Sequence, residues 1–270
     1  MTTPIRLSLT KHHGLGNDFL VAFDPDVDDL PELARQVCDR RRGIGADGLL
    51  VATTVDDGRG RMVLYNADGS RAEMSGNGIR CFAHAVARRT GSLEPQRIVT
   101  DAGERLVELA PTESPDTLDA TVEMGAVETL DEPDGWSALG THPDRPVAHL
   151  DLGNPHSVVG VDDVGAVDLA LLGGQAPHVN LEIIEPGPEA NAITMRVHER
   201  GVGITDACGT GACAAAWAAV SWGLVAASVS ELVVHMDGGS ARVAVNRPTE
   251  GVITLTGPTT YVGTIEIDHP

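Results

Sequence analysis

A cysteine followed by two glycines stands where the sequence changes from a polar turn to an apolar run. Cys208-Gly-Thr-Gly211 precedes residues 212–225, which are almost entirely Ala, Trp, Val and Leu and predict a buried helix. The unpaired N–H groups and the macrodipole of a helix N-terminus favour anions, so this position should lower a thiol's pKa and supply a thiolate near neutrality. The alternative interpretation, favoured for a lone cysteine, is a small buried thiol beside a helix cap.

A second segment repeats this pattern. Ser75-Gly-Asn-Gly78 also follows a glycine-rich polar turn and also precedes a predicted helix, residues 79–88. Each segment reads as a small nucleophilic residue, glycine, polar residue, glycine and helix. We therefore predict a duplicated half and two helix N-termini that can bind one anion.

Composition excludes several classes of function. The 270 residues carry a formal net charge of −20, which argues against a nucleic-acid partner. The spacing of Cys38, Cys81, Cys208 and Cys213 matches neither a zinc ribbon nor a disulfide framework. With no signal-peptide pattern and no run of membrane-spanning length, we expect a cytoplasmic protein with reduced thiols and no membrane association.

Metal and cofactor motifs are also missing from the sequence. The ten histidines include no His-Glu-x-x-His or similar ligand spacing, so we expect no metal site. Gly76-Asn-Gly78 lacks the spacing of a phosphate-binding or dinucleotide-binding loop. A pyridoxal enzyme needs a Schiff-base lysine, and Lys11 is the only lysine, so that cofactor is not expected.

The remaining pattern predicts an α+β protein in which each half places strands around one buried helix. We place a domain boundary near residue 125, within a segment at 111–146 that is rich in Pro, Asp, Glu and Gly. The glycines at residues 11–18 predict a loop. Helices are predicted at 29–40, 79–88 and 212–225, and strands at 5–9, 19–23, 49–53, 61–65, 97–100, 105–109, 120–124, 147–152, 158–161, 178–184, 193–198, 231–235, 242–245, 252–256 and 261–267.

The ordered set of polar and glycine motifs resembles that of the diaminopimelate epimerase family, over nearly the whole chain. The resemblance implies two pseudo-symmetric domains, residues 1–125 and 126–260, each a mostly antiparallel sheet wrapped around a central helix. It implies that strand 261–270 completes the first domain and that the active site lies in the cleft between the domains. The motifs are His13-Gly-Leu-Gly-Asn-Asp-Phe19, Arg42-Gly-Ile-Gly-Ala-Asp47, Asn66-Ala-Asp-Gly-Ser70, Gly76-Asn-Gly78, Gly153-Asn-Pro-His156, Glu199-Arg-Gly201 and Ala207-Cys-Gly-Thr-Gly-Ala212.

The resemblance also implies a reaction and its residues. The family interconverts LL- and meso-diaminopimelate for lysine and peptidoglycan precursors without cofactor or metal, through two acid–base groups that flank the α-carbon. Cys208 and the residue at position 75 match the catalytic pair, the partner is a small-molecule amino acid, and we expect a homodimer. The implied substrate-binding residues are Asn17, Asn66, Gly76, Asn77, Asn154, Asn180, Glu199, Arg200, Gly209 and Thr210.

The chain departs from the family at two positions. Ser75 stands where the family has its first cysteine, and a serine hydroxyl is far less acidic than a thiol of pKa about 8.5. Ile204 stands where the family usually has glutamate, and Cys81 lies on another face of the predicted helix, so we do not expect it to replace the missing thiol. Ser75 is then an introduced substitution, a natural variant that works directly or through water, or a sign of another function: a one-base dehydratase or racemase, or a catalytically dead amino-acid-binding protein.

Overall fold

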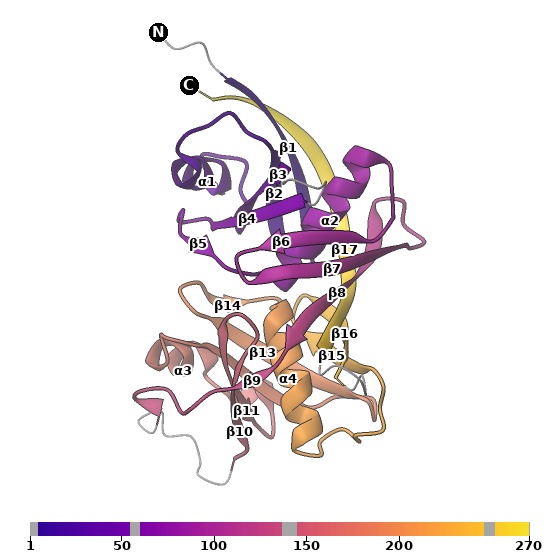
Figure 1. Cartoon of the computed structure of the whole chain (residues 1–270). Coiled ribbons are helices and arrows are strands. Elements are labelled where there is room, and N and C mark those ends of the chain that lie inside the picture. Colours follow the sequence, from indigo (N-terminus) through magenta and orange to yellow (C-terminus); the bar gives the residue numbers. More distant parts are fainter. Residues whose placement is uncertain (1–4, 55–59, 137–144, 246–251, 270) are drawn as a thin grey trace. The chain divides into compact units, whose positions relative to one another are not determined.

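The chain forms two compact units in a computed structural model that describes residues 5–54, 60–136, 145–245 and 252–269. The first unit comprises Met1–Val122 with Gly257–Pro270, and the second comprises Glu123–Thr256 (Figure 1). Both are sheet-rich α+β structures. None of the helices in the described ranges combines the length and the apolar character needed to cross a membrane.

The strands of the first unit pair mainly in antiparallel fashion. The described exceptions are β2 with β3 and β4 with β6, which run parallel. The elements are β1 (Ile5–Gly14), β2 (Asn17–Phe23), α1 (Leu30–Cys38), β3 (Gly48–Thr54), β4 (Gly60–Asn66), β5 (Arg71–Ala72), α2 (Gly76–Thr90), β6 (Gln96–Thr100), β7 (Gly103–Pro111) and β8 (Thr117–Ala126).

Helix α2 is the central helix of this unit. It packs against β1, β2, β3, β4 and β7, and most of its residues from Gly76 to Ala87 are buried. It ends at Gly91, whose φ of 71° lies in the left-handed region that glycine adopts without strain. Because strands surround α2, its first turn is held in one place by the sheet.

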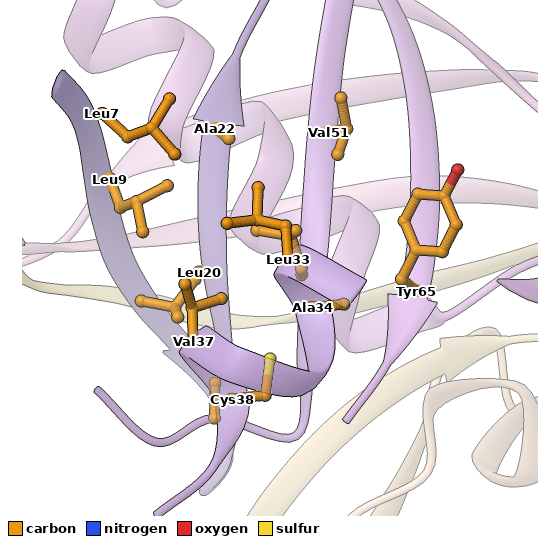
Figure 2. Packing of buried hydrophobic residues seen from close by; sticks show 12 residues of the cluster. Leu7, Leu9, Leu20, Ala22, Leu33, Ala34, Val37, Cys38, Val51 and Tyr65 are labelled. Carbon is orange, nitrogen blue, oxygen red and sulfur yellow. The ribbon is translucent and has the colours of Figure 1, made fainter. Parts of the chain in front are cut away.

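Helix α1 packs on the sheet with a single apolar face. Leu33, Ala34 and Val37 are buried, as the helical spacing predicted, and Asp29 caps the helix by accepting from the Glu32 amide. Figure 2 shows these side chains facing the strands. The cluster joins them to Leu7, Leu9, Leu20, Ala22, Cys38, Ala46, Leu49, Val51 and Tyr65.

The second unit surrounds α4 with strands. This helix packs against β10, β11, β12, β13, β15 and β16, and its alanines allow these strands to approach closely. Parallel pairing joins β11 to β12 and β13 to β15. The elements are β9 (Glu128–Thr129), β10 (Val147–Asp151), β11 (Pro155–Gly160), η3 (Val164–Ala166), α3 (Leu169–Gln175), β12 (Asn180–Pro186), β13 (Ala192–Glu199), β14 (Gly203–Thr205), α4 (Gly209–Ser221), β15 (Leu232–Met236) and β16 (Gly239–Ala244). The last strand, β17 (Val252–His269), begins in this unit and continues from Gly257 in the first unit.

The predicted loop at 11–18 is wrong. Strand β1 continues to Gly14, and β2 begins at Asn17. Leu15 and Gly16 have φ of 56° and 88°, the positive values that a tight two-residue hairpin turn requires. The glycines therefore mark a turn of two residues, and Lys11 and His12 belong to a paired strand.

The predicted strands 252–256 and 261–267 are one strand, β17. Residues 254–256 pair with β16 and residues 260–269 pair with β1, so Gly257 and Pro258 lie where the strand changes partner. Helices α2 and α4 each begin three residues before the predicted start, because Ser75 and Cys208 themselves cap them. The short helix α3 was not predicted. Of the segment at 111–146, residues 137–144 lie outside the described ranges.

Candidate active site

Ser75 is the N-cap of α2. Its backbone is extended, with φ of −143° and ψ of 122°, and its Oγ accepts a hydrogen bond from the Gly78 amide at 3.0 Å. A serine in this geometry satisfies one of the amides that a helix start leaves without an intrahelical partner. The position combines a hydroxyl group with the positive end of the helix dipole.

A buried guanidinium group forms hydrogen bonds with the helix start that carries Ser75. Arg80 is fully buried and donates from Nη2 to Asn77 Oδ1 at 2.7 Å and from Nη1 to the Gly76 carbonyl at 3.1 Å. Asn77 Nδ2 donates to Asn17 Oδ1 at 3.1 Å, and Asn17 Nδ2 donates to Asp47 Oδ2 at 2.8 Å. Two predicted site residues, Asn17 and Asn77, are thus in direct contact.

Asn66 is held separately, at the end of β4. Its Nδ2 donates to Ser70 Oγ at 3.0 Å, and its backbone amide donates to the Ser70 carbonyl at 2.8 Å. The turn that follows is tied to Asp47, whose carbonyl accepts from the Ala67 amide at 3.0 Å. Asp47 therefore links the segment of Asn66 to that of Asn17.

Cys208 caps α4 in the same way that Ser75 caps α2. Its φ and ψ are −126° and 116°, and its Sγ accepts from the Gly211 amide at 3.4 Å. The Thr210 hydroxyl lies 3.5 Å from the same sulfur. In both units, a hydroxyl or thiol side chain in extended backbone accepts a hydrogen bond from the amide three residues ahead.

The remaining predicted residues of the second unit form two groups. Asn154 Nδ2 donates to Thr210 Oγ1 at 3.3 Å, which places Asn154 beside the start of α4. Asn180 Oδ1 accepts from the Arg200 amide at 2.9 Å, and Asn180 Nδ2 donates to the Pro155 carbonyl at 3.0 Å. Because Pro155 follows Asn154, the second group adjoins the first through the chain.

The surroundings of Cys208 do not favour the thiolate that the sequence predicted. Burial raises the pKa of this thiol well above its ordinary value, and the nearby carboxylates of Glu199 and Glu182 raise it further. The hydrogen bonds from Thr210 and Gly211 lower the pKa but do not outweigh these effects. The lowered thiol pKa that the helix N-terminus predicted is therefore wrong, because burial and the two carboxylates outweigh the helix start.

Glu199 lies near Cys208, and each influences the pKa of the other. Burial raises the pKa of this carboxyl group, while hydrogen bonds from Thr205 and from the Cys208 thiol lower it. The Thr205 hydroxyl donates to Glu199 Oε1 at 2.5 Å. A carboxylate that accepts from the thiol can act as the base that converts it to a thiolate.

Two buried charged residues beside the helix starts were not predicted as site residues. They are Arg80 in α2 and Glu182 in β12, both fully buried. The available signal was a charged residue within an otherwise apolar helix or strand, since such residues are rarely buried unless paired. Cys81, by contrast, is enclosed in α2, and burial raises the pKa of its thiol to about 12.

The residues that the structure describes contain no group of three or more His, Cys, Asp or Glu side chains arranged to hold a metal ion. Each of the two helix starts combines a hydroxyl or thiol side chain with backbone amides. A helix start of this kind suits proton transfer next to a carboxylate, because its amides stabilise the charge that develops.

The fold is of the class seen in PhzF-family and proline-racemase-like structures, which it resembles at 17% sequence identity or less. A PhzF-family phenazine biosynthesis protein from Bacillus anthracis matches with a TM-score of 0.74 and 14% identity, over 97% of this chain and 99% of that one. A predicted epimerase from Pseudomonas aeruginosa has a TM-score of 0.74, 17% identity and the same coverage. A hydroxyproline epimerase from Agrobacterium vitis, with bound trans-4-hydroxy-L-proline, has a TM-score of 0.70 and 13% identity, over 97% and 92% of the two chains.

Within this class, the chain belongs to the diaminopimelate epimerase family, whose profile matches residues 9–130 and 149–262. The diaminopimelate epimerase of Thermosynechococcus vestitus is 38% identical, over 93% of this chain and 96% of that protein. Those of Synechococcus elongatus and Halothermothrix orenii are 36% and 34% identical, over 97% and 98% of this chain and 99% and 100% of theirs. The predicted family is confirmed, and the protein is an isomerase of the amino-acid epimerase class.

Proposed function

We propose that this protein interconverts LL- and meso-diaminopimelate by proton transfer at the α-carbon, with Cys208 as a strong acid–base group and Ser75 as a weak one. The observation that carries the proposal is the matched geometry of the two helix caps, each with an acid–base side chain at the N-terminus of a central helix. The names of the relatives support the substrate.

In this proposal, one substrate is held by both helix starts. The amides of Gly76, Asn77, Gly209 and Thr210 bind the α-carboxylate, where they stabilise the charge that builds as the α-proton leaves. The amide and carboxylate side chains of Asn17, Asn66, Asn154, Asn180 and Glu199, together with the Arg200 guanidinium, hold the rest of the amino acid. The guanidinium suits a carboxylate because it binds in a bidentate, directional way.

Cys208 works in both directions of the reaction. As an acid, its thiol delivers a proton to the α-carbanion, and Sγ becomes a thiolate. As a base, it first passes its proton to Glu199, and the thiolate then takes the α-proton from that face of the substrate. The raised pKa of Cys208 makes the thiol the resting form, so the enzyme without substrate is ready to act as an acid on this side.

Ser75 limits the rate of proton transfer at the opposite face of the α-carbon. Its hydroxyl must deliver a proton to the carbanion and become an alkoxide, or pass a proton through water, and either step is harder than the same transfer from a thiol. We therefore expect α-proton exchange on the Cys208 side to be faster than inversion. The expected homodimer and cytoplasmic location remain predictions; light scattering of the purified protein and fractionation of the source cells test them.

The test is proton NMR of LL- and meso-diaminopimelate incubated with the protein in D₂O, following deuterium incorporation and stereochemical inversion together. The proposal expects exchange that is faster than inversion, with slow inversion from both isomers. Exchange of one isomer without inversion would mean that Cys208 acts alone and that Ser75 is not an acid–base group. No exchange from either isomer would contradict diaminopimelate as the substrate and favour another amino acid, a dehydratase or a binding role.

A further inference from the structure

Glu182 is a fully buried carboxyl group whose role the proposed reaction does not explain. It lies in β12 with apolar residues before and after it, and its Oε1 is 2.7 Å from His156 Nδ1, which is also fully buried. Burying such a pair costs several kcal/mol of desolvation for each charged group. Its position beside the start of α4 suggests what the pair does.

The first turn of α4 is built around this carboxyl group. A Cβ atom at Gly211 would lie 2.6 Å from Glu182 Oε1 and 3.2 Å from Cys208 Sγ. Glycine is therefore needed at this position for the carboxyl group to reach the helix start. Glu182 and the sulfur of Cys208 thus both lie against the side of Gly211 that a Cβ atom would occupy.

The hydrogen bonds from His156 run in one direction, toward the sulfur. His156 Nε2 lies 2.9 Å from Asn154 Oδ1, and an amide oxygen only accepts, so Nε2 carries a hydrogen. Asn154 Nδ2 donates to Thr210 Oγ1, which leaves the Thr210 hydrogen available for Cys208 Sγ at 3.5 Å. Aligned donors strengthen one another and favour negative charge on the final acceptor.

The proton on Nε2 depends on Glu182. His156 Nε2 already carries the hydrogen that it donates to Asn154. A bare Nδ1 and a carboxylate oxygen are both acceptors, so their close contact requires one further proton, which the two groups share. Without the carboxyl group, the imidazole would be free to rotate or to take the tautomer with hydrogen on Nδ1. Asn154 would then lose the donor that orients its amide.

We propose that Glu182 is a positioning residue for Cys208: it fixes His156, which orients Asn154, which in turn directs the Thr210 hydroxyl to the sulfur. This inference rests on the proposed function, because it names the residues that prepare Cys208 for proton transfer. Thr210 and Asn154 are also proposed to hold the substrate, so the same chain aligns the substrate with the thiol. Misplacement of reacting groups by about 1 Å can cost about a hundredfold in rate.

The experiment compares two substitutions of Glu182. In Glu182→Gln, the amide N–H can donate to His156 Nδ1 and keep hydrogen on Nε2, so α-proton exchange should retain more than about half of its kcat. Glu182→Ala removes the contact and should lower kcat about ten- to a hundredfold and raise KM, because Asn154 is no longer oriented. Rescue by glutamine but not by alanine distinguishes positioning from a general packing role.

A second readout needs no substrate and no activity. In protein labelled with ¹⁵N-histidine, the Nε2–H of His156 should give a slowly exchanging NMR signal in the parent protein and in Glu182→Gln, and the signal should disappear in Glu182→Ala. If the parent protein exchanges no α-proton, the proposed function fails, but this NMR comparison still decides the role of Glu182. An unchanged signal and unchanged exchange in folded Glu182→Ala would overturn the inference.

Glu185 supplies a matched control on the same strand. Its Oε2 accepts from the Val164 amide at 2.7 Å, away from the chain that leads to Cys208. Glu185→Ala should lower the melting temperature without changing the NMR signal or the exchange rate. A loss of exchange equal to that of Glu182→Ala would show that any lost carboxylate on β12 impairs the site, and would overturn the positioning role.

If Glu182→Ala does not fold, the pH dependence of α-proton exchange by Glu182→Gln tests the role of Glu182 instead. The ionisable groups that face Cys208 are Glu199, Glu182 and, through Glu182, His156. Because His156 and Glu182 share one proton, the pair carries no net charge, and neutral His156 with glutamine carries none either, so Glu182→Gln should leave the pH profile of exchange close to that of the parent protein. A clear shift of the profile would show that Glu182 acts on Cys208 through its charge and not through His156, and would overturn the inference.

Discussion

Arg80 Nη2 donates to Asn77 Oδ1 at 2.7 Å, and both side chains are almost completely buried. The contact places a full positive charge under the helix start that carries Ser75, since the same guanidinium also binds the Gly76 carbonyl. The corresponding helix start in the second unit instead lies against an acidic side chain, the buried carboxyl group of Glu182. The two acid–base positions thus have different electrostatic surroundings although their backbone geometry matches.

Ser75→Cys should increase the rate of epimerisation by orders of magnitude. A thiol at this position would cap a helix N-terminus whose next residue, Gly76, binds the Arg80 guanidinium, and helix N-termini and nearby cations lower a thiol's pKa. The rate of inversion in D₂O, measured on both isomers, checks this. Ser75→Ala is the matched control: it removes the cap and the hydroxyl, costs about 1 kcal/mol of stability and should abolish inversion. Equal inversion by the parent protein and Ser75→Ala would remove Ser75 from the mechanism.

Cys208→Ala should abolish α-proton exchange from both isomers, because no other described acid–base group caps α4. Cys213 in the same helix provides the control, since it is fully buried one turn further along. Cys213→Ala should keep its exchange activity and lose only a little stability. Exchange that persists in Cys208→Ala would assign the reaction to another base.

Gly211→Ala should destabilise the protein by about 1–3 kcal/mol and remove most of the activity, because the new methyl group meets Glu182 Oε1 and Cys208 Sγ. Urea unfolding and the exchange assay measure the two effects. A Cβ atom added at Gly174 in α3 would meet no other atom within 4 Å, so Gly174→Ala should leave activity unchanged and stability equal or slightly higher. A stable, fully active Gly211→Ala protein would contradict the tight approach of Glu182.

Stability should fall as the pH drops from about 6.5 toward 4. Burial is the main reason that the pKa of His12 is lowered to about 3 and that of His84 to about 4, and their rings pack with centroids 4.9 Å apart. The unfolded state, with ordinary histidine pKa values near 6.5, binds more protons in this range, so protons favour unfolding. Both histidines are neutral above this range, where the destabilisation disappears.

Urea unfolding at several pH values between 4 and 7 checks this dependence. His12→Gln should flatten the curve, because one of the two buried titrating groups is gone. His178 is exposed, so His178→Gln should leave the slope unchanged. A parent protein equally stable at pH 4.5 and 7 would show that protonation of the buried rings carries no cost.

Some features of the site are predictable from the local sequence, and others are not. Glycine and small polar residues before an apolar run are a local signal, because only the first turn of a helix leaves amides to be capped. For this reason Ser75 and Cys208 could be recognised from the sequence as matched helix starts, and the motifs identified the family. The α+β class was likewise predictable from the alternation of apolar residues. The tight turn at Leu15 and Gly16 was not, because the sequence predicted a longer loop there.

Other features depend on contacts between residues far apart in the chain. The sequence places His156 and Glu182 twenty-six positions apart, and only the parallel pairing of β11 with β12 brings their side chains together. The acidity of Cys208 follows the same rule: its place at a helix start favours a thiolate, but its enclosure and the carboxylates of Glu199 and Glu182 reverse the balance. Local sequence determined which residues carry the chemistry, and tertiary structure decided their protonation, because desolvation and charge act through space.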